Sequence, residues 1–355
     1  MAFINTIAAF KVLTIAAFSF LTAQILVPIV TEFLYKNKFW RKSVRTKAID
    51  GQDVSNFQKL HGEGEIKTPR MGGVLIWLPP LVVAFILHIC AKFGVPGLAS
   101  LDFFTRDQTW IPFFALVVAA IVGLVDDLLQ VKGKGDYIAG GLSLRYRLLL
   151  FAFMGFVGGW WCYYKLGWST VYIPFVGDVN FGIFYILFFI VVMMATYSGG
   201  VIDGIDGLAA GSFLSMFGAY GLIAWMFHQY DLASFCFAVF GSLLTYLWFN
   251  IPPAKFYMGE TGSMALCASL AVVAFFTNSV MYLPLIGFLL VWESLSVIIQ
   301  LLSKKFLKKK FFLAAPIHLH YEAKGWPPYK VTMRFWVIGV ICAILGIIAR
   351  LAVLR

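Results

Sequence analysis

Long apolar runs recur along the whole chain and limit what it can fold into. A helix needs about 20 apolar residues to cross a bilayer. We expect ten such spans, at residues 5–34, 72–93, 109–128, 147–165, 181–198, 207–228, 232–249, 263–279, 281–302 and 333–354. Of the 355 residues, 61% are hydrophobic and 13% are charged, against about 45–50% and 25% in soluble domains. The sequence therefore predicts an all-α polytopic membrane protein that forms one domain, residues 1–355.

The basic residues predict the orientation of these spans. Most of the 28 Lys and Arg residues fall in the odd-numbered loops, whereas the even loops hold Lys92, Arg106 and Lys165. Positive loops stay in the cytoplasm, so both termini are expected outside it. The net charge of +11 fits attraction to anionic lipid headgroups or phosphate substrates, and nothing calls for nucleic acid. The predicted cytoplasmic loops are 35–71, 126–147, 199–207, 250–263 and 303–333.

Five carboxylates gather in these loops. Asp126 and Asp127 are adjacent, so they repel each other unless a cation or proton intervenes. Asp203 and Asp206 would share one face if their segment is helical, although the surrounding glycines also suit helix packing. Glu260 precedes an expected helix start, where free backbone N–H groups favour an anion. A lone acidic residue often only solvates a helix end, but all five are expected at one membrane face.

The loop 303–333 adds two histidines and a basic run. His318 and His320 could bind phosphate when protonated, or ligate a metal. The stretch "KKFLKKKFF" is typical of an interfacial basic amphipathic segment. Hard divalent cations prefer carboxylate oxygens, and Mg²⁺ also bridges phosphates. With neither a Walker motif nor a serine–histidine–acid arrangement, the residues indicate Mg²⁺-assisted phosphate chemistry at the bilayer surface.

Five motifs occur in order along nearly the whole chain: "TPRMGG", "GLVDD", "IDGIDGLA", "YMGETGS" and "PIHLHYEAKGW…VTMRFW". On these motifs the chain resembles the phospho-N-acetylmuramoyl-pentapeptide transferases. These belong to the polyprenyl-phosphate N-acetylhexosamine-1-phosphate transferase superfamily. The aspartate motifs are shared by the superfamily, whereas the histidine segment points to the muramoyl-pentapeptide branch.

The resemblance implies a reaction and a place for it. Undecaprenyl phosphate would attack the β-phosphate of UDP-N-acetylmuramoyl-pentapeptide, with Mg²⁺, to give lipid I and UMP for peptidoglycan synthesis. The resemblance also implies a homodimer in the bacterial inner membrane, with its active site on the cytoplasmic side. Catalytic roles are implied for Asp126, Asp127 and Glu260, with Asp127 and Glu260 at the metal. Substrate-binding roles are implied for Lys67, Thr68, Asp203, Asp206, His318 and His320.

The chain departs from the family pattern at several motifs. Glu260 stands in place of an aspartate, and its extra methylene shifts the carboxylate by more than about an ångström, which can cost about a hundredfold in rate. Gly200 replaces an asparagine and Leu319 replaces the middle histidine. Gly140 lies where a lysine is common, and Arg70 is a possible substitute cation. We expect an active enzyme in spite of these changes.

Three other functions remain open at this point. A sister enzyme would transfer GlcNAc-1-phosphate or a similar sugar phosphate, which suits "IDGIDG" but not the histidine segment. An ion-coupled transporter would use intramembrane carboxylates and broken helices, but its site would lie near the bilayer midplane. An inactive relative would still bind partners or lipid without Mg²⁺-dependent turnover.

Overall fold

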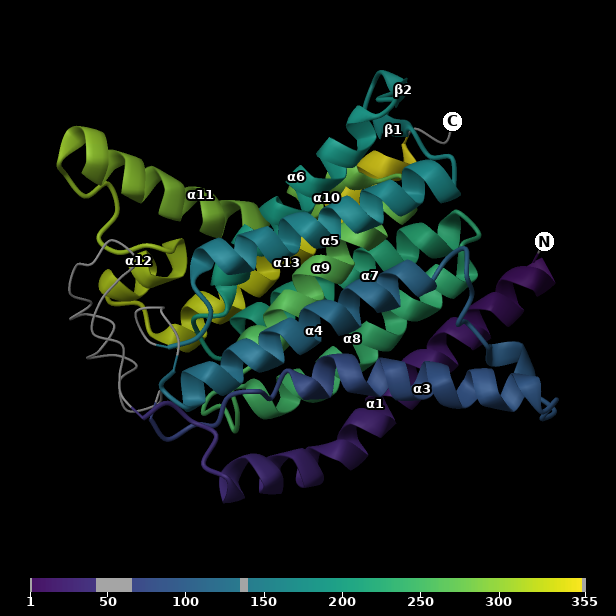
Figure 1. The fold of residues 1–355 in the computed structure, drawn as a ribbon, viewed down its shortest axis with the longest axis horizontal. Helices are drawn as coiled ribbons and strands as arrows, with labels where there is room; N and C mark the ends of the chain where they lie inside the picture. The colour runs from purple at the N-terminus through teal and green to yellow at the C-terminus, as the bar shows by residue number, and fades with distance from the viewer. Residues whose placement is uncertain (1, 43–65, 135–139, 353–355) are drawn as a thin grey trace.

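The computed structural model describes residues 2–42, 66–134 and 140–352. Parts of two predicted cytoplasmic loops, 43–65 and 135–139, lie outside the described residues. The longer helices are α1 (Ala2–Lys36), α3 (Val74–Lys92), α4 (Trp110–Val131), α5 (Leu144–Lys165), α6 (Phe184–Ser198), α7 (Leu208–Met226), α8 (Tyr230–Asn250), α9 (Gly259–Phe276), α11 (Phe288–Leu302) and α13 (Pro328–Leu351) (Figure 1). The short elements are β1 (Thr170–Ile173), β2 (Gly177–Asn180), α10 (Leu283–Ile286) and α12 (Ile317–Ala323), with single helical turns at Ala99–Leu101, Gly199–Ile202, Val280–Tyr282 and Ser303–Leu307.

The helical, polytopic architecture agrees with the prediction. Among the described residues, eight helices are long and apolar enough to cross a membrane. A ninth span is possible if the pair Val280–Ile286 and Phe288–Leu307, bent by 77°, counts as one. Helix α5 covers the remaining predicted span, with 22 residues, but is not among these apolar candidates. Ten spans and their orientation stay predictions.

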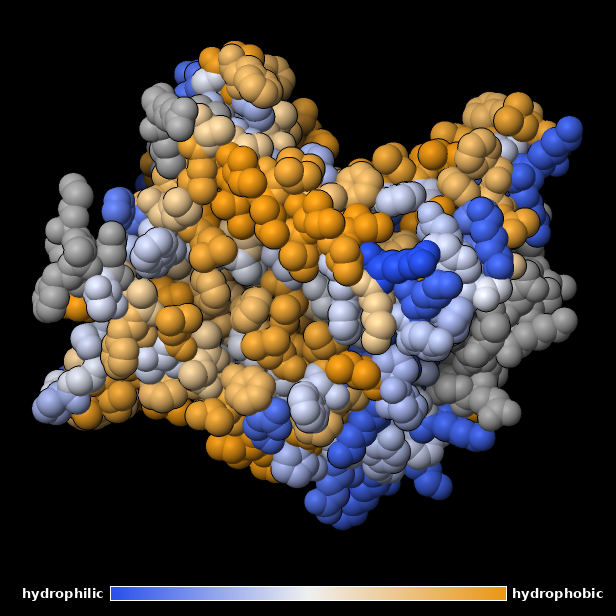
Figure 2. Space-filling model, turned by 180° about the vertical axis from the view of Figure 1, so that it is seen from behind, coloured by the Kyte–Doolittle hydropathy of each residue, from blue (hydrophilic) through white to orange (hydrophobic). Residues whose placement is uncertain are grey.

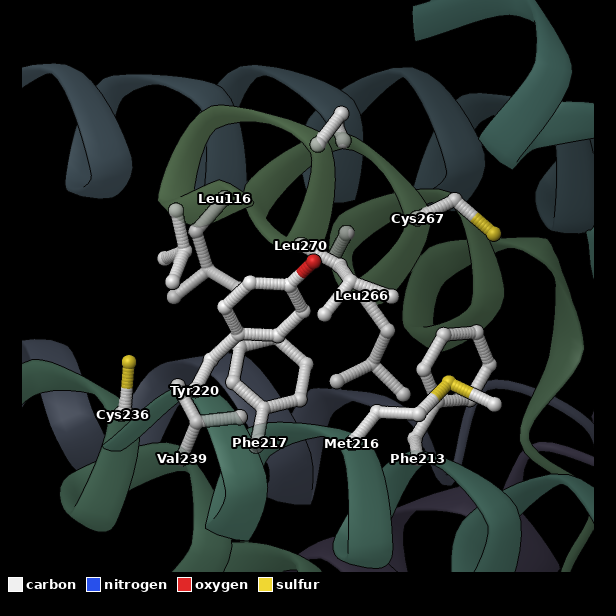
Figure 3. Packing of buried hydrophobic residues seen from close by; sticks show 14 of the residues in the cluster. Leu116, Phe213, Met216, Phe217, Tyr220, Cys236, Val239, Leu266, Cys267 and Leu270 are labelled. Carbon is white, nitrogen blue, oxygen red and sulfur yellow. The ribbon is translucent and has the colours of Figure 1, made fainter. Parts of the chain in front are cut away.

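Helix α9 lies at the centre of the bundle. In its most apolar stretch, 94% of the residues are buried, and α4 packs along it. Figure 3 shows the adjoining core, where Phe217 and Tyr220 of α7 meet Leu116 of α4 and Leu270 of α9. A helix that is buried on all sides gives the site a rigid central support.

One element is not helical and was not predicted. Strands β1 and β2 form an antiparallel hairpin in which Val171 pairs with Val179. The hairpin connects α5 to α6, and Asn278 accepts a hydrogen bond from the Tyr172 N–H at 3.0 Å. The mostly helical structure agrees with the all-α prediction, which did not include this short hairpin.

The molecule has two distinct ends. Helix α12 lies at one end, and the start of α1 and the end of α13 lie at the other (Figure 1). Figure 2, seen from behind, shows a broad apolar band across the middle and most of the hydrophilic side chains at the α12 end. An apolar band of this kind suits contact with lipid acyl chains.

Candidate active site

The site begins where α4 approaches α9 at glycine residues. A Cβ on Gly123 would lie 2.2 Å from the Glu260 carbonyl oxygen and 2.6 Å from the Thr261 Cα. Gly259, with φ of +71°, leaves no room for a side chain because a Cβ would lie 2.3 Å from an oxygen of Asp127. Only glycine permits such an approach, so these positions bring the carboxylates of α4 to the start of α9.

Asp127 caps the N-terminus of α9 from outside that helix. Its oxygens accept the backbone N–H of Glu260 at 3.1 Å and of Thr261 at 3.0 Å. The Arg70 Nε lies 3.5 Å from the same carboxylate, which is fully buried. The anion expected at this helix start is thus a side chain of the protein itself. Glu260 does not precede α9, as predicted, but lies in its first turn.

Asp126, also fully buried, faces a different set of donors. The Leu142 N–H donates to it at 2.5 Å and the Gln130 amide at 2.7 Å. Arg147 at the start of α5 lies 2.9 Å from Asp126 and 2.6 Å from Glu260. One guanidinium therefore holds carboxylates from α4 and α9 together, an arrangement for which its planar set of donors is suited.

The Asp203–Asp206 segment is a turn rather than a helix, so the condition for a shared helical face is not met. Burial is the main cause that raises the pKa of Asp203 to about 7; nearby Arg70 lowers it, and Glu260 and Asp127 raise it. Asp203 therefore lies in the same electrostatic field as the α4–α9 carboxylates. Asp206 accepts the Ala254 N–H at 3.1 Å, which ties this turn to the segment before α9.

His318 on α12 reaches the same turn. Its Nδ1 lies 3.0 Å from the fully buried Glu293 carboxylate of α11, and its Nε2 lies 2.3 Å from where a Cβ on Gly204 would stand. Burial lowers the pKa of His318, but Glu293, Glu322 and Asp203 together raise it overall. The contact of Nδ1 with Glu293 leaves the other ring nitrogen, Nε2, facing Gly204 beside Asp203.

Three predicted site residues lie at the margin. His320 is half-buried, its Nδ1 accepts the Leu313 N–H at 3.1 Å, and burial and Lys324 lower its pKa. Lys67 is exposed and Thr68 is half-buried. They precede Pro69, whose carbonyl accepts the Tyr257 N–H at 2.8 Å, so they adjoin the segment that leads into α9. Their binding roles stay predictions.

Two residues that organise the site escaped the sequence reading. Arg147 entered it only as one of the cytoplasmic positive charges, and Glu293 was not considered. Both carry a charge at or inside an apolar run, "RLLLFAF" and "GFLLVWESLSV". A charge at membrane depth is a functional hypothesis by default, so this signal could have identified both.

The arrangement brings together more carboxylates than guanidinium groups. Within the described residues, no three His, Cys, Asp or Glu side chains form a ready metal-binding group. Four carboxylates nevertheless share the site with two arginines that pair with them directly or electrostatically. The carboxylates are those of Asp126, Asp127, Asp203 and Glu260, and the arginines are Arg70 and Arg147. Carboxylates that outnumber the guanidinium groups beside them can bind a divalent cation through their oxygens.

Comparison with known proteins gives this geometry a context. The model of the family described as "Glycosyl transferase family 4" matches residues 109–278 of the chain. A protein of Geobacillus sp. (strain WCH70) is 35% identical over 93% of this chain and 94% of its own length. Proteins of Geobacillus kaustophilus, at 36% over 93% and 95%, and of Clostridium perfringens (strain 13 / Type A), at 34% over 93% and 96%, are similar. Each of the three is named phospho-N-acetylmuramoyl-pentapeptide-transferase.

Proposed function

The chain belongs to the phospho-N-acetylmuramoyl-pentapeptide transferase family and is an enzyme of peptidoglycan synthesis, and from this premise we propose its reaction in full. It transfers phospho-N-acetylmuramoyl-pentapeptide from the UDP derivative to undecaprenyl phosphate. The products are lipid I and UMP. The observation that carries the proposal is the likeness over 93% of the chain to transferases of that name, and the clustered carboxylates supply a suitable site.

The chemistry is a displacement at phosphorus. An oxygen of the lipid phosphate forms a bond to the β-phosphorus of the nucleotide, and the bond from that phosphorus to the bridging oxygen of UMP breaks. Such a step depends on positioning and on neutralising charge at the phosphoryl oxygens. We assign charge neutralisation to Arg70 and Arg147, which already lie among the carboxylates. We propose that His318, which contacts Glu293, donates a hydrogen bond to a phosphate near the Asp203 turn.

We propose that Mg²⁺ binds among the carboxylates, with Glu260 and Asp127 as protein ligands. When bound, it would neutralise phosphate charge. The four clustered carboxylates support this, and Glu260 is the most accessible of those that pair with an arginine, with a side chain that is 23% exposed. Asp126 is assigned to activation of the lipid phosphate, and Asp203 and Asp206 to the nucleotide.

The departures from the family pattern have local explanations. The longer side chain of Glu260 spans the distance to Arg147 at 2.6 Å. A Cβ on Gly200 would meet only the Cys267 sulfur, at an ordinary 3.6 Å, so the missing asparagine leaves space rather than a clash. Leu319 is half-buried beside the buried His318. None of these substitutions removes a contact that holds the carboxylates together, which supports activity.

The site lies at the end of the molecule that carries the predicted cytoplasmic loops (Figure 1). A multi-pass membrane protein is established by the apolar helices. We propose the bacterial inner membrane, with the site facing the cytoplasm where the soluble nucleotide is available. Homodimerisation stays a prediction from the resemblance.

UMP release tests the reaction. Purified protein in lipid is mixed with undecaprenyl phosphate, Mg²⁺ and either UDP-N-acetylmuramoyl-pentapeptide or UDP-GlcNAc. EDTA and the variant Asp203→Asn serve as controls, with thermal unfolding to verify folding. We expect release from the muramoyl substrate alone and its loss with EDTA. Release from UDP-GlcNAc alone would assign the chain to sugar-phosphate transfer, and no release from either would refute both.

The cation is tested separately by binding. Mn²⁺ is titrated into the protein and followed by electron paramagnetic resonance, because Mn²⁺ accepts the same oxygen ligands. We expect Glu260→Gln to weaken binding and Glu260→Asp to retain it. Equal binding by all three proteins would exclude Glu260 as a ligand.

A further inference from the structure

Helix α11 has its polar face turned inwards. Its buried polar side chains are Glu293, Ser296 and Gln300, with Ser303 directly after them. This spacing of three and four residues places them along one stripe. The opposite side is apolar and exposed, at Leu295 (48%), Ile298 (47%), Ile299 (39%), Leu301 (39%) and Leu302 (49%). A helix in water shows the reverse pattern, so the outer side of α11 is built for lipid.

The helix also stands away from the bundle. It follows the 77° bend after α10, and Figure 1 shows it projecting beyond α13. In Figure 2, seen from behind, the projection at the α12 end is apolar, with hydrophilic side chains along one edge. The exposed apolar side of this projecting helix therefore faces lipid rather than other helices of the bundle.

The chain after α11 folds back in a defined turn. The Gln300 side chain accepts the N–H of Phe311 at 3.1 Å and of Phe312 at 2.9 Å, and its amide donates to the Phe312 carbonyl at 2.9 Å. The Ser303 hydroxyl donates to the carbonyl of Lys309 at 2.8 Å. Two side chains of the inner stripe therefore hold residues 305–311 in one shape, which we call the basic turn.

The basic turn combines cations with apolar side chains. Its lysines are all exposed, and none forms an ion pair with another described residue. They are Lys305, Lys308, Lys309 and Lys310. Three large apolar side chains are interleaved with them, Phe306 (70% exposed), Leu307 (67%) and Phe311 (65%). A segment of alternating cations and aromatic or aliphatic groups is suited to the boundary between headgroups and acyl chains.

We propose that the basic turn binds the anionic phospholipid headgroups of the membrane and thereby seats the far end of α11. The lysines face the phosphates while Phe306, Leu307 and Phe311 enter the acyl boundary. A lysine near an anionic membrane surface contributes roughly a fivefold change in binding. A soluble anion would use the charges but not the exposed apolar groups, which is why a lipid is the better occupant.

Lipid retention tests the proposal without any turnover, so its outcome is independent of the transferase reaction. Full-length protein is equilibrated at low salt with equimolar phosphatidylglycerol and phosphatidylcholine in detergent, and the retained lipids are measured by mass spectrometry. The test variant is K305Q/K308Q/K309Q/K310Q. The matched control, K36Q/K38Q/K132Q/K134Q, removes four exposed lysines from the same end of the molecule.

We expect the unaltered protein and the control to retain phosphatidylglycerol preferentially. The test variant should lose at least fivefold of this preference, with its thermal unfolding unchanged. Salt of about 1 M, where the Debye length is about 3 Å, should abolish the preference in all three proteins. No preference in the unaltered protein, or an equal loss in the control, would overturn the proposal. Displacement of the lipid by millimolar inorganic phosphate would show a general anion site and would also overturn it.

Discussion

The two ends of the bundle both carry charged groups, but they balance them differently. At the far end, the Lys11 ammonium pairs with one carboxylate, Asp231, at 2.6 Å. The Arg350 guanidinium there lies 4.8 Å from the Tyr172 ring and 4.3 Å from the Phe227 ring. At the α12 end, four carboxylates share two arginines.

This difference distinguishes ion pairs that stabilise the fold from charged groups that are available to a ligand. A one-to-one pair is satisfied by the protein and asks for no ligand. An excess of buried negative charge is costly in the free protein, and it is relieved only when a cation or proton arrives. The crowding of carboxylates, rather than charge itself, thus distinguishes the end at which we propose that substrate and metal bind.

The first prediction concerns the close approach of α4 to α9 at Gly123, which brings the carboxylates together. Gly123→Ala would push a Cβ into the backbone at Glu260 and Thr261. Overpacking costs about 1–3 kcal/mol, and a shift of about 1 Å in the site costs about a hundredfold in rate. We expect UMP release to fall at least that far. Gly218→Ala on α7 is the control, since its nearest neighbour is a flexible Phe240 side chain at 3.3 Å. Equal losses in both variants would show that the α4–α9 approach has no special role.

Arg147 tests the imbalance directly. Arg147→Met leaves Asp126 and Glu260 without their shared guanidinium, and breaking a buried pair costs about 3–5 kcal/mol. The accessible Glu260 softens this cost, so we expect a folded protein with about a hundredfold lower kcat. Arg147→Lys keeps the charge and should recover part of the rate, as measured by UMP release. Full activity of the Met variant would show that the excess charge is unimportant.

Much of the bundle could be predicted because a membrane leaves few choices. Backbone groups in lipid must be paired within each helix, so apolar runs alone located the helices. The gathering of Asp126, Asp203 and Glu260 at one end followed from the same loops. The start of α9 could not be predicted, since it depends on Asp127, a capping group 133 and 134 residues away in the chain from the two N–H groups that it accepts.

Neither the bend between α10 and α11 nor the partners of Arg147 and Glu293 could be predicted from the sequence. The 77° break after α10 falls at Gly287, and a single glycine in an apolar run does not by itself predict a bend. Arg147 and Glu293 were visible as charges near apolar runs, but their partners lie on other helices. The hairpin at Thr170–Asn180 is too short for its alternation to stand out.

Glu293 sets the charge of His318. Glu293→Gln keeps a hydrogen-bond partner but removes the carboxylate that raises the pKa of His318. Glu322 and Asp203 still raise the pKa of His318, but burial is offset less, so the imidazole becomes neutral at lower pH. If His318 contacts phosphate as a cation, we expect about tenfold lower kcat at pH 7, with recovery as the pH falls. The pH profile of UMP release checks this, and an alkaline limb at the same pH in both proteins would contradict it.

Titration of Asp203, at the α12 end, should make the stability of the protein depend on pH. Its pKa rises from 3.8 unfolded to about 7 folded, so the folded state keeps a proton that the unfolded state releases. Stability is therefore fully present below about pH 4 and is lost as the pH rises through about 7. We expect Asp203→Asn to flatten this decline in thermal unfolding, without Mg²⁺, by a few degrees. An unchanged slope would assign the decline to other groups.

A substitution at the far end should have the smallest effect on thermal unfolding and on UMP release. Lys11→Met removes one partner of a balanced pair whose side chains are 16% and 20% exposed, together with a hydrogen bond to the Asp102 carbonyl at 2.6 Å. Partly exposed pairs contribute about 1 kcal/mol or less, so thermal unfolding should shift only slightly. UMP release should stay within about twofold, because no excess charge is created near the site. If Lys11→Met lowered kcat as far as Arg147→Met does, charge balance would not distinguish the two ends, and the α12 end would need another explanation for its carboxylates.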